Sequence, residues 1–276
     1  MDVRYTVGRN EMKRMTTEEL RAAFVNTKLW EKGRVNLMYC EVERGIAGFA
    51  VPAAKPLALP AGRELASAFF CERRELGALN IGGEGSVTVD GKKHALRPLD
   101  VLYVGKGAKK VVFASKSAKK PAEFYLVSYP AHKAFPTKLV RFEDAASRHL
   151  GTKEDCNERT IRQYILPGKC ESCQLVMGVT RLEPGSNWNT MPAHTHERRT
   201  EMYMYFGIEP EATVFHFMGP CDETRHLAVH NRDVVVSPMW SIHSGVGTRS
   251  YTFCWAMGGE NQAFDDMDGI ATDDLR

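Results

Sequence analysis

The sequence predicts an all-β protein made of two β-barrels, with a short N-terminal helix and a partly helical linker. From residue 34 onward, short alternating or β-branched runs are interrupted by Gly, Pro and Asp. Turn signals at intervals of about 8 to 12 residues are typical of a sandwich or barrel. A charged passage divides these runs into two similar series, and helical periodicity is scarce beyond the N-terminus.

The N-terminal helix is predicted over residues 17–25, TEELRAAFV. Thr16 precedes this segment and Glu19 follows three residues later, which is the spacing of a capping box. In that motif the hydroxyl and the carboxylate each accept a hydrogen bond from a free backbone N–H at the helix start. We therefore expect the helix to begin directly after Thr16.

The first series of strands predicts a barrel in the first half of the chain. Asp90-Gly91, between SVTV and KKHAL, is the strongest short-range signal for a hairpin. This half contains no His-x-His, so we expect its barrel to lack a metal site. The strand-like runs lie at 34–44, 46–52, 85–91, 100–105, 110–115 and 123–130.

Residues 137–160, TKLVRFEDAASRHLGTKEDCNERT, form the expected linker, because they are rich in charge and poor in β-branched residues. We place the domain junction near 140–158, which predicts an N-terminal barrel over 1–145 and a C-terminal barrel with the metal site over 146–276. Strand signals then resume at 162–168, 173–185, 200–206, 212–219, 226–231, 233–238 and 250–259.

The composition is that of a globular protein in a reducing compartment. The 276 residues are 43% hydrophobic and 26% charged, and the net charge of +3 is too small to indicate nucleic acid or membrane as a partner. The N-terminus lacks the apolar core of a signal peptide, so we expect a cytoplasmic location. Seven irregularly spaced cysteines argue against a disulfide framework, and the single CxxC at Cys170 and Cys173 lacks a second pair for structural zinc.

Four residues of the second series have the chemistry and spacing of a metal site inside a barrel. His194 and His196 alternate, so on a strand they face one side. Glu201 opens the apolar run MYMYF, and His243 follows the run DVVVSP. Three imidazoles and one carboxylate suit a borderline divalent ion, and Zn, Fe, Mn and Ni all remain open. The neighbouring histidines at 216, 226 and 230 are more often structural than ligands.

These residues match the cupin superfamily, whose first motif carries His-x-His, Glu and Gly and whose second carries Pro and His. Here those positions are His194, His196, Glu201, Gly207, Pro238 and His243. The longer string NTMPAHTHERRTEMYMYF, with RRELGALNIGGEGSVTVDG upstream and WAMGGENQAFDDMD downstream, resembles the 5-keto-4-deoxyuronate isomerase family, the 4-deoxy-L-threo-5-hexosulose-uronate ketol-isomerases. The similarity covers nearly the whole chain. One departure is Glu197, where many members have Asp.

The resemblance implies a bicupin, usually hexameric, with one zinc in the C-terminal barrel held by His194, His196, Glu201 and His243. It further implies an aldose–ketose isomerase that converts the unsaturated uronate released from pectin or glycosaminoglycans, after ring opening, to 3-deoxy-D-glycero-2,5-hexodiulosonate. The metal would act as a Lewis acid toward an enediolate. An Fe(II) cupin oxygenase and a non-catalytic sugar-acid-binding cupin are the alternatives.

The residues that move the proton and bind the substrate are left open by the sequence. Tyr203 and Tyr205 share strand parity with Glu201, so either could donate or relay a proton, although both could simply line the barrel. Three arginines could clamp the substrate carboxylate, because guanidinium matches a carboxylate in a bidentate geometry. These are Arg181, Arg198 and Arg199.

Overall fold

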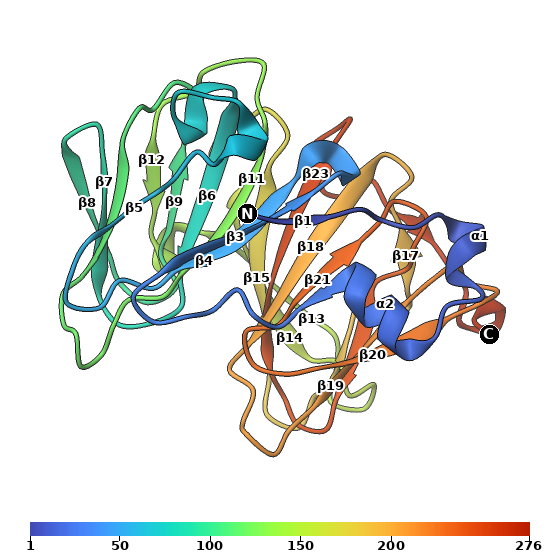
Figure 1. The fold of residues 1–276 in the computed structure, drawn as a ribbon. Coiled ribbons are helices and arrows are strands. Elements are labelled where there is room, and N and C mark those ends of the chain that lie inside the picture. Colours follow the sequence, from blue (N-terminus) through green and yellow to red (C-terminus); the bar gives the residue numbers. More distant parts are fainter. The chain divides into compact units, whose positions relative to one another are not determined.

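The computed structural model describes residues 1–276 and divides the chain into two compact units (Figure 1). The first unit comprises Met1–Arg4, Lys28–Ala146 and Tyr164–Val176, and the second comprises Tyr5–Thr27, Ser147–Gln163 and Met177–Arg276. Each unit contains one seven-stranded and one four-stranded sheet, so the predicted all-β fold is confirmed. None of the helices has the length and apolar character needed to span a lipid bilayer.

The two sheets of the first unit share one apolar core. Val87 and Phe113 from the small sheet pack in the same cluster as Leu76, Leu102 and Leu126 from the large sheet. The large sheet, in spatial order, is β1 (Asp2–Arg4), β3 (Val35–Cys40), β4 (Ile46–Ala50), β11 (Phe124–Pro130), β6 (Arg74–Asn80), β9 (Val101–Val104) and β12 (Lys138–Val140). The small sheet is β5 (Leu57–Ala58), β10 (Val111–Ser115), β7 (Gly85–Val89) and β8 (Lys92–Leu96).

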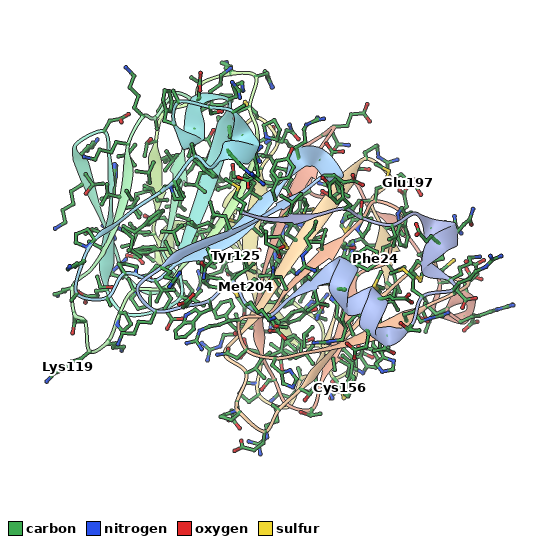
Figure 2. The ribbon with its side chains drawn as sticks, viewed as in Figure 1. Phe24, Lys119, Tyr125, Cys156, Glu197 and Met204 are labelled. Carbon is green, nitrogen blue, oxygen red and sulfur yellow. The ribbon has the colours of Figure 1, made fainter.

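The hairpin predicted at Asp90-Gly91 is confirmed. Val89 of β7 pairs with Lys92 of β8 across a two-residue turn. Both turn residues have positive φ, 47° for Asp90 and 88° for Gly91, as a type I′ turn requires. In Figure 2, Lys119 projects away from this unit, whereas Tyr125 of β11 is fully buried.

The second unit repeats the seven-plus-four arrangement. Its large sheet, in spatial order, is β13 (Ala146–Leu150), β14 (Arg159–Ile165), β15 (Val176–Leu182), β23 (Thr252–Gly259), β18 (Arg199–Phe206), β21 (Val234–Ser237) and β2 (Val25–Asn26). Its small sheet is β16 (Trp188–Asn189), β22 (Ser244–Gly247), β19 (Val214–Met218) and β20 (Arg225–Val229). A separate two-stranded ladder joins β17 (His194–Thr195) to β24 (Asp268–Gly269).

Helical structure is short and lies mostly at the N-terminus. The α-helices are α1 (Arg9–Met12) and α2 (Thr17–Phe24), and the predicted capping box is present in α2. The backbone N–H of Glu19 donates to the Thr16 hydroxyl at 3.3 Å, and the backbone N–H of Thr16 donates to the Glu19 carboxylate at 2.7 Å. Single 3-10 turns lie at Val42–Arg44, Arg63–Leu65, Phe70–Glu72, Phe142–Asp144 and Thr272–Asp274.

The linker predicted over 137–160 is more extended than helical. Its only helical element is the 3-10 turn at Phe142–Asp144, and Ala146–Leu150 forms strand β13. The seven cysteines are free thiols, with Cys40, Cys71, Cys170 and Cys254 buried.

Candidate metal centre

Four elements of the second unit bring the predicted metal-site residues together. His194 opens β17, where it pairs with Gly269 of β24, and His196 follows directly after this short strand. Glu201 lies on β18, paired with Ser237 of β21, and His243 lies in the connection between β21 and β22. His196, Glu201 and His243 are 2%, 4% and 2% exposed, so their polar ends face the interior.

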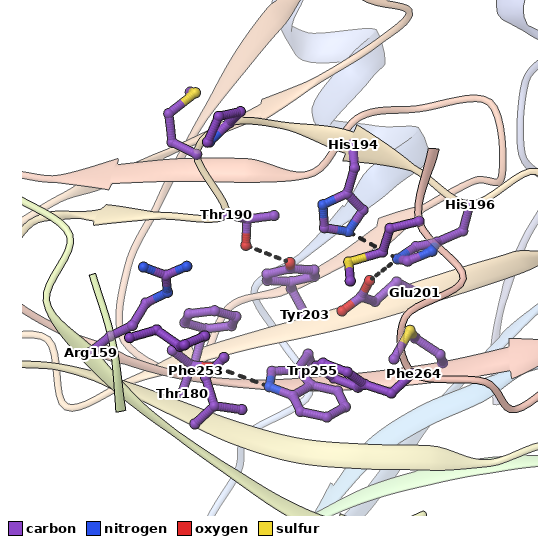
Figure 3. A pocket seen from close by; sticks show the side chains of 16 residues that line it. Arg159, Thr180, Thr190, His194, His196, Glu201, Tyr203, Phe253, Trp255 and Phe264 are labelled. Carbon is purple, nitrogen blue, oxygen red and sulfur yellow. Dashed lines mark hydrogen bonds and ion pairs between the residues drawn. The ribbon is translucent and has the colours of Figure 1, made fainter. Parts of the chain in front are cut away.

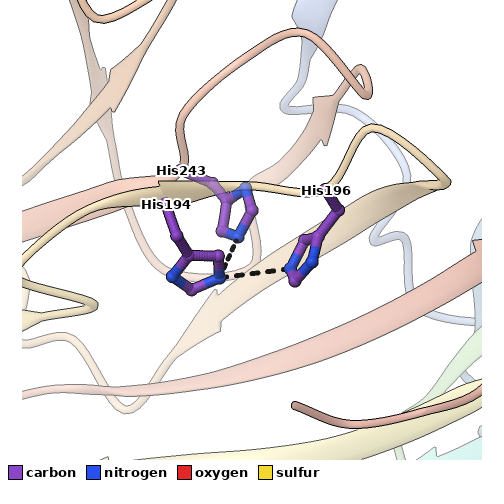
Figure 4. A group of neighbouring side chains, drawn as sticks. All are labelled: His194, His196 and His243. Carbon is purple, nitrogen blue, oxygen red and sulfur yellow. Dashed lines mark hydrogen bonds between the residues drawn. The ribbon is translucent and has the colours of Figure 1, made fainter. Parts of the chain in front are cut away.

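The donor atoms of the three histidines lie close together (Figure 4), and the Glu201 carboxylate lies beside two of them. His194 Nε2 lies 3.1 Å from His196 Nε2 and 3.0 Å from His243 Nε2. The Glu201 carboxylate lies 3.4 Å from His196 Nε2 and 3.0 Å from His243 Nε2. Donors bonded to one ion at about 2.1 Å lie roughly 3.0 to 3.4 Å apart at neighbouring vertices of an octahedron or tetrahedron. The donor set therefore fits a divalent metal, and the three histidines alone form a cluster able to hold one.

A loop near the C-terminus fixes the orientation of His196. His196 Nδ1 lies 2.6 Å from the carbonyl oxygen of Asp266 and 3.0 Å from the guanidinium of Arg199, so both groups fix the position of the ring. His196 Nε2, on the other side of the ring, faces the cluster. Arg199 is 1% exposed and donates to the Asp266 carbonyl at 2.6 Å and to the Ala263 carbonyl at 2.7 Å. Arg199 thus stabilises the loop whose Asp266 carbonyl contacts His196.

The electrostatic surroundings keep two of the imidazoles neutral. Burial, with His196 and Arg199 close by, lowers the pKa of His194 to about 3. Burial and the neighbouring histidines also place the pKa of His243 well below its ordinary value. Neutral imidazoles are the form that binds metal, so these residues are ready to act as ligands at neutral pH.

A cavity of about 260 Å³ opens beside the cluster, entirely within the second unit (Figure 3). Its wall is mostly aromatic and aliphatic. Trp255 is held in this wall by a 3.0 Å hydrogen bond from its indole N–H to the Thr180 hydroxyl. The lining residues are Leu150, Arg159, Ile161, Thr180, Thr190, Met191, Pro192, His194, His196, Glu201, Tyr203, Phe253, Trp255, Met257, Phe264 and Met267.

The two tyrosines singled out in the sequence have different surroundings. Tyr203 lines the cavity and stacks on Phe253 with ring centroids 5.0 Å apart. The Tyr203 hydroxyl lies 3.5 Å from the Thr190 hydroxyl. Tyr205 is not among the lining residues, and its hydroxyl bonds to Nδ1 of buried His216 at 2.7 Å. Burial raises the pKa of both tyrosines well above the ordinary value, so both stay protonated at neutral pH.

The three arginines proposed from the sequence do not line the cavity. Arg181 is exposed on β15. Arg198 forms ion pairs with Asp266 at 2.6 Å and Asp268 at 2.8 Å, and Arg199 is buried against backbone carbonyls. The structure instead places Arg159 in the cavity wall. Sequence reasoning missed it because Arg159 falls at the end of the charged linker, where it resembles a solvated residue.

Comparison with known families identifies relatives over the full length of the chain. The KduI/IolB family matches residues 24–271. A 4-deoxy-L-threo-5-hexosulose-uronate ketol-isomerase of Shouchella clausii is 51% identical over 276 residues, covering all of both chains. A protein of the same name from Lachnoclostridium phytofermentans is 49% identical over 276 residues, again with complete coverage of both chains.

Solved structures share the fold at low sequence identity. An IolB-like protein from Salmonella typhimurium superimposes with a TM-score of 0.72 at 16% identity, covering 90% of this chain and 96% of that one. Oxalate decarboxylase from Bacillus subtilis, whose structural description names Mn(II) centres, superimposes with a TM-score of 0.56 at 12% identity, covering 79% of this chain and 70% of that one. Both likenesses concern the cupin-like fold alone.

Proposed function

This chain belongs to the KduI/IolB family, and we propose that it is a ketol-isomerase that converts 4-deoxy-L-threo-5-hexosulose uronate to 3-deoxy-D-glycero-2,5-hexodiulosonate. It is therefore an intramolecular oxidoreductase acting on a small molecule. The observation that carries the proposal is a cluster of three imidazoles with a carboxylate beside it, next to a cavity that His194, His196 and Glu201 line, in a chain 49–51% identical to ketol-isomerases over its whole length.

We assign His194, His196, Glu201 and His243 as the ligands of one divalent ion. The distances of 3.0–3.4 Å between four pairs of these donors and the burial of His196, Glu201 and His243 support this assignment. Zinc is the proposed occupant, with Fe, Mn and Ni as the alternatives, because all four suit imidazole and carboxylate donors. When bound, such an ion supplies Lewis acidity that polarises a carbonyl oxygen.

The isomerisation requires a proton to leave C2 of the open-chain sugar and another to arrive at C1. Tyr203 is the proposed proton donor or relay, because its hydroxyl lies in the cavity wall within reach of Thr190. Tyr205 has a supporting part, since its hydroxyl is taken by His216. The apolar wall around them limits water near the reacting carbons, which protects the intermediate from side reactions.

The direct experiment is an assay with the unsaturated uronate that a polysaccharide lyase releases. The purified protein should consume this uronate and form the 2,5-diketo product, and a chelator should abolish turnover until a divalent metal is added back. Oxygen consumption during turnover would favour the Fe(II) oxygenase instead. Binding of the uronate without any conversion, at full metal content, would favour the non-catalytic sugar-acid-binding protein.

Assembly and pathway are inferred from the family resemblance, and the location from the sequence; all three stay predictions. We expect a cytoplasmic homohexamer that acts in the catabolism of uronates from pectin or glycosaminoglycans. Light scattering on the purified chain measures the assembly directly, and a monomer or dimer at working concentration would contradict it.

A further inference from the structure

Arg159 is the only arginine or lysine among the residues that line the cavity. It begins β14 and is partly buried, with Ile161 of the same strand also in the cavity wall. Its one hydrogen bond within the protein goes from the guanidinium to the backbone carbonyl of Asn157, at 2.8 Å. No carboxylate lies within ion-pair distance of it.

This pairing differs from that of the other arginines near the site. Arg198 forms ion pairs with two aspartates within 3 Å, and Arg199 donates hydrogen bonds to backbone carbonyls of the C-terminal loop. Most of the five N–H donors of Arg159 have no acceptor within the protein, and the side chain is partly buried in the cavity wall. Burial also lowers the pKa of Arg159, as expected for a cation that lacks an anion nearby. A partly buried cation of this kind is stabilised when an anion enters the cavity.

The place of Arg159 within the cavity matches the layout of the substrate. In Figure 3, Arg159 and the cluster of His194, His196 and Glu201 lie toward opposite ends, with Tyr203 between them. An open-chain hexuronate has its carboxylate at C6 and its reacting carbons at C1 and C2. A molecule bound by its carboxylate at Arg159 would therefore extend its carbonyl end toward the proposed metal ligands.

We propose that Arg159 binds the C6 carboxylate of the substrate and makes the enzyme specific for uronates over neutral sugars. This proposal rests on the proposed function, because it assumes a uronate in this cavity. The guanidinium presents parallel N–H donors to both carboxylate oxygens, a geometry that lysine cannot reproduce. Arg159 thus takes the part that the sequence pattern suggested for Arg181, Arg198 or Arg199.

The test compares Arg159→Gln and Arg159→Lys with Arg181→Gln, at the one exposed position of β15, as the matched control. With the lyase-derived uronate, Arg159→Gln should raise KM by about 100-fold with a smaller loss of kcat, because it removes a charge-assisted bidentate contact made before chemistry. Arg159→Lys should recover part of that loss. Arg181→Gln should leave both constants unchanged.

A binding readout separates this proposal from the proposed function. Wild-type protein should bind D-glucuronate more tightly than D-glucose by calorimetry, and Arg159→Gln should lose this preference at unchanged metal content. An inactive wild type that still prefers glucuronate through Arg159 would refute the isomerase but not the carboxylate site. An unchanged KM and unchanged preference in Arg159→Gln would overturn the proposal. So would failure of both Arg159 variants to fold, because the side chain would then be structural.

Discussion

The two units have the same strand arrangement but different interiors. Position by position, β6 of the first unit corresponds to β18 of the second, and β7 corresponds to β19. In the first unit these strands contribute Leu76 and Val87 to an apolar core. In the second they contribute Glu201 and His216, both buried, beside a cavity and a metal-site cluster. The same strand order can therefore enclose either an apolar core or a cavity lined in part by buried polar side chains.

Both units contain the same turn before corresponding strands of their large sheets. Asp100 ends the connection before β9, and Asp233 ends the connection before β21. Each carboxylate accepts from the backbone N–H three residues earlier, at 2.8 Å in the first unit and 2.9 Å in the second. The preceding residues, Leu99 and Arg232, both have positive φ, 66° and 73°. The same local structure thus recurs in two different electrostatic settings.

Removing a proposed metal ligand from the second unit should have the largest effect on activity. Glu201→Ala deletes one proposed ligand, so bound metal should fall and isomerase activity should decrease by about 1,000-fold or more. Metal analysis and the uronate assay measure both quantities. Unfolding monitored by circular dichroism should stay cooperative, as expected if the residue serves chemistry and not the fold. Wild-type activity in this variant would remove Glu201 from the site.

Truncating a core side chain of the first unit should lower the stability of the protein and leave the metal site intact. Leu76→Ala leaves a cavity in the core of the first unit, and we expect a loss of about 2–5 kcal/mol in the free energy of unfolding. The metal content and KM of the molecules that remain folded should match wild type. Denaturant unfolding and metal analysis on the same sample provide the check. Loss of metal without loss of stability would contradict the assignment of Leu76 to the stability of the first unit alone.

Weakening the support of His196 should have an intermediate effect. Arg199→Lys keeps the charge but cannot reach the Ala263 and Asp266 carbonyls together, so the loop that orients His196 should loosen. We expect metal affinity to fall by about 10- to 100-fold, as for other partners that orient a ligand. Competition with a chromophoric chelator measures the change. Arg198→Lys, on the partly exposed neighbour, is the matched control and should have a smaller effect.

The smallest expected effect concerns the shared turn and its dependence on pH. Burial opposes the charge of Asp100, but hydrogen bonds from the Arg97 backbone and from Arg141 lower its pKa below the ordinary value. Its charge therefore stabilises the folded state above pH 4, and this contribution is lost as pH falls through the lowered pKa. Asp100→Asn should destabilise the first unit at pH 7, and its difference from wild type should shrink as pH falls through the lowered pKa.

The aspartate in the second unit should behave in the reverse way. Burial raises the pKa of Asp233 by more than the backbone of His230 lowers it. Its ionisation therefore costs stability as pH rises through the raised pKa, so Asp233→Asn should be neutral or slightly stabilising at pH 7. Hydrogen exchange resolved by peptide reports each unit separately. Equal destabilisation by both substitutions at pH 7 would show that the two turns have the same electrostatics.

Much of the fold could be predicted because its signals are local. The Asp90-Gly91 turn and the Thr16 cap are each determined by a few adjacent residues. Strand β6 gave no such signal, since Arg74, Glu75 and Gly77 interrupt its apolar pattern although every residue is buried. Glu75 is satisfied only by groups distant in sequence, among them the Tyr103 hydroxyl at 2.8 Å and the backbone N–H of Leu175 at 2.8 Å. No local pattern contains that information.

In the candidate site, too, some residues could be predicted from the sequence and others could not. The proposed ligands could be selected from the sequence because metal binding restricts residue type and spacing; that they hold a metal stays a prediction. Arg159 could not be selected, because its distinguishing property is the lack of an anionic neighbour, which only the folded cavity reveals. The support of His196 by the Asp266 carbonyl was hidden for a similar reason, since any residue can supply a backbone oxygen.

The most direct test of the central claim is a uronate assay on the metal-stripped protein titrated with zinc. If the cluster of His194, His196, Glu201 and His243 forms the working site, isomerase activity should rise from background to a plateau at one zinc per chain. Turnover of the uronate at full rate by protein shown to contain no metal would contradict the account.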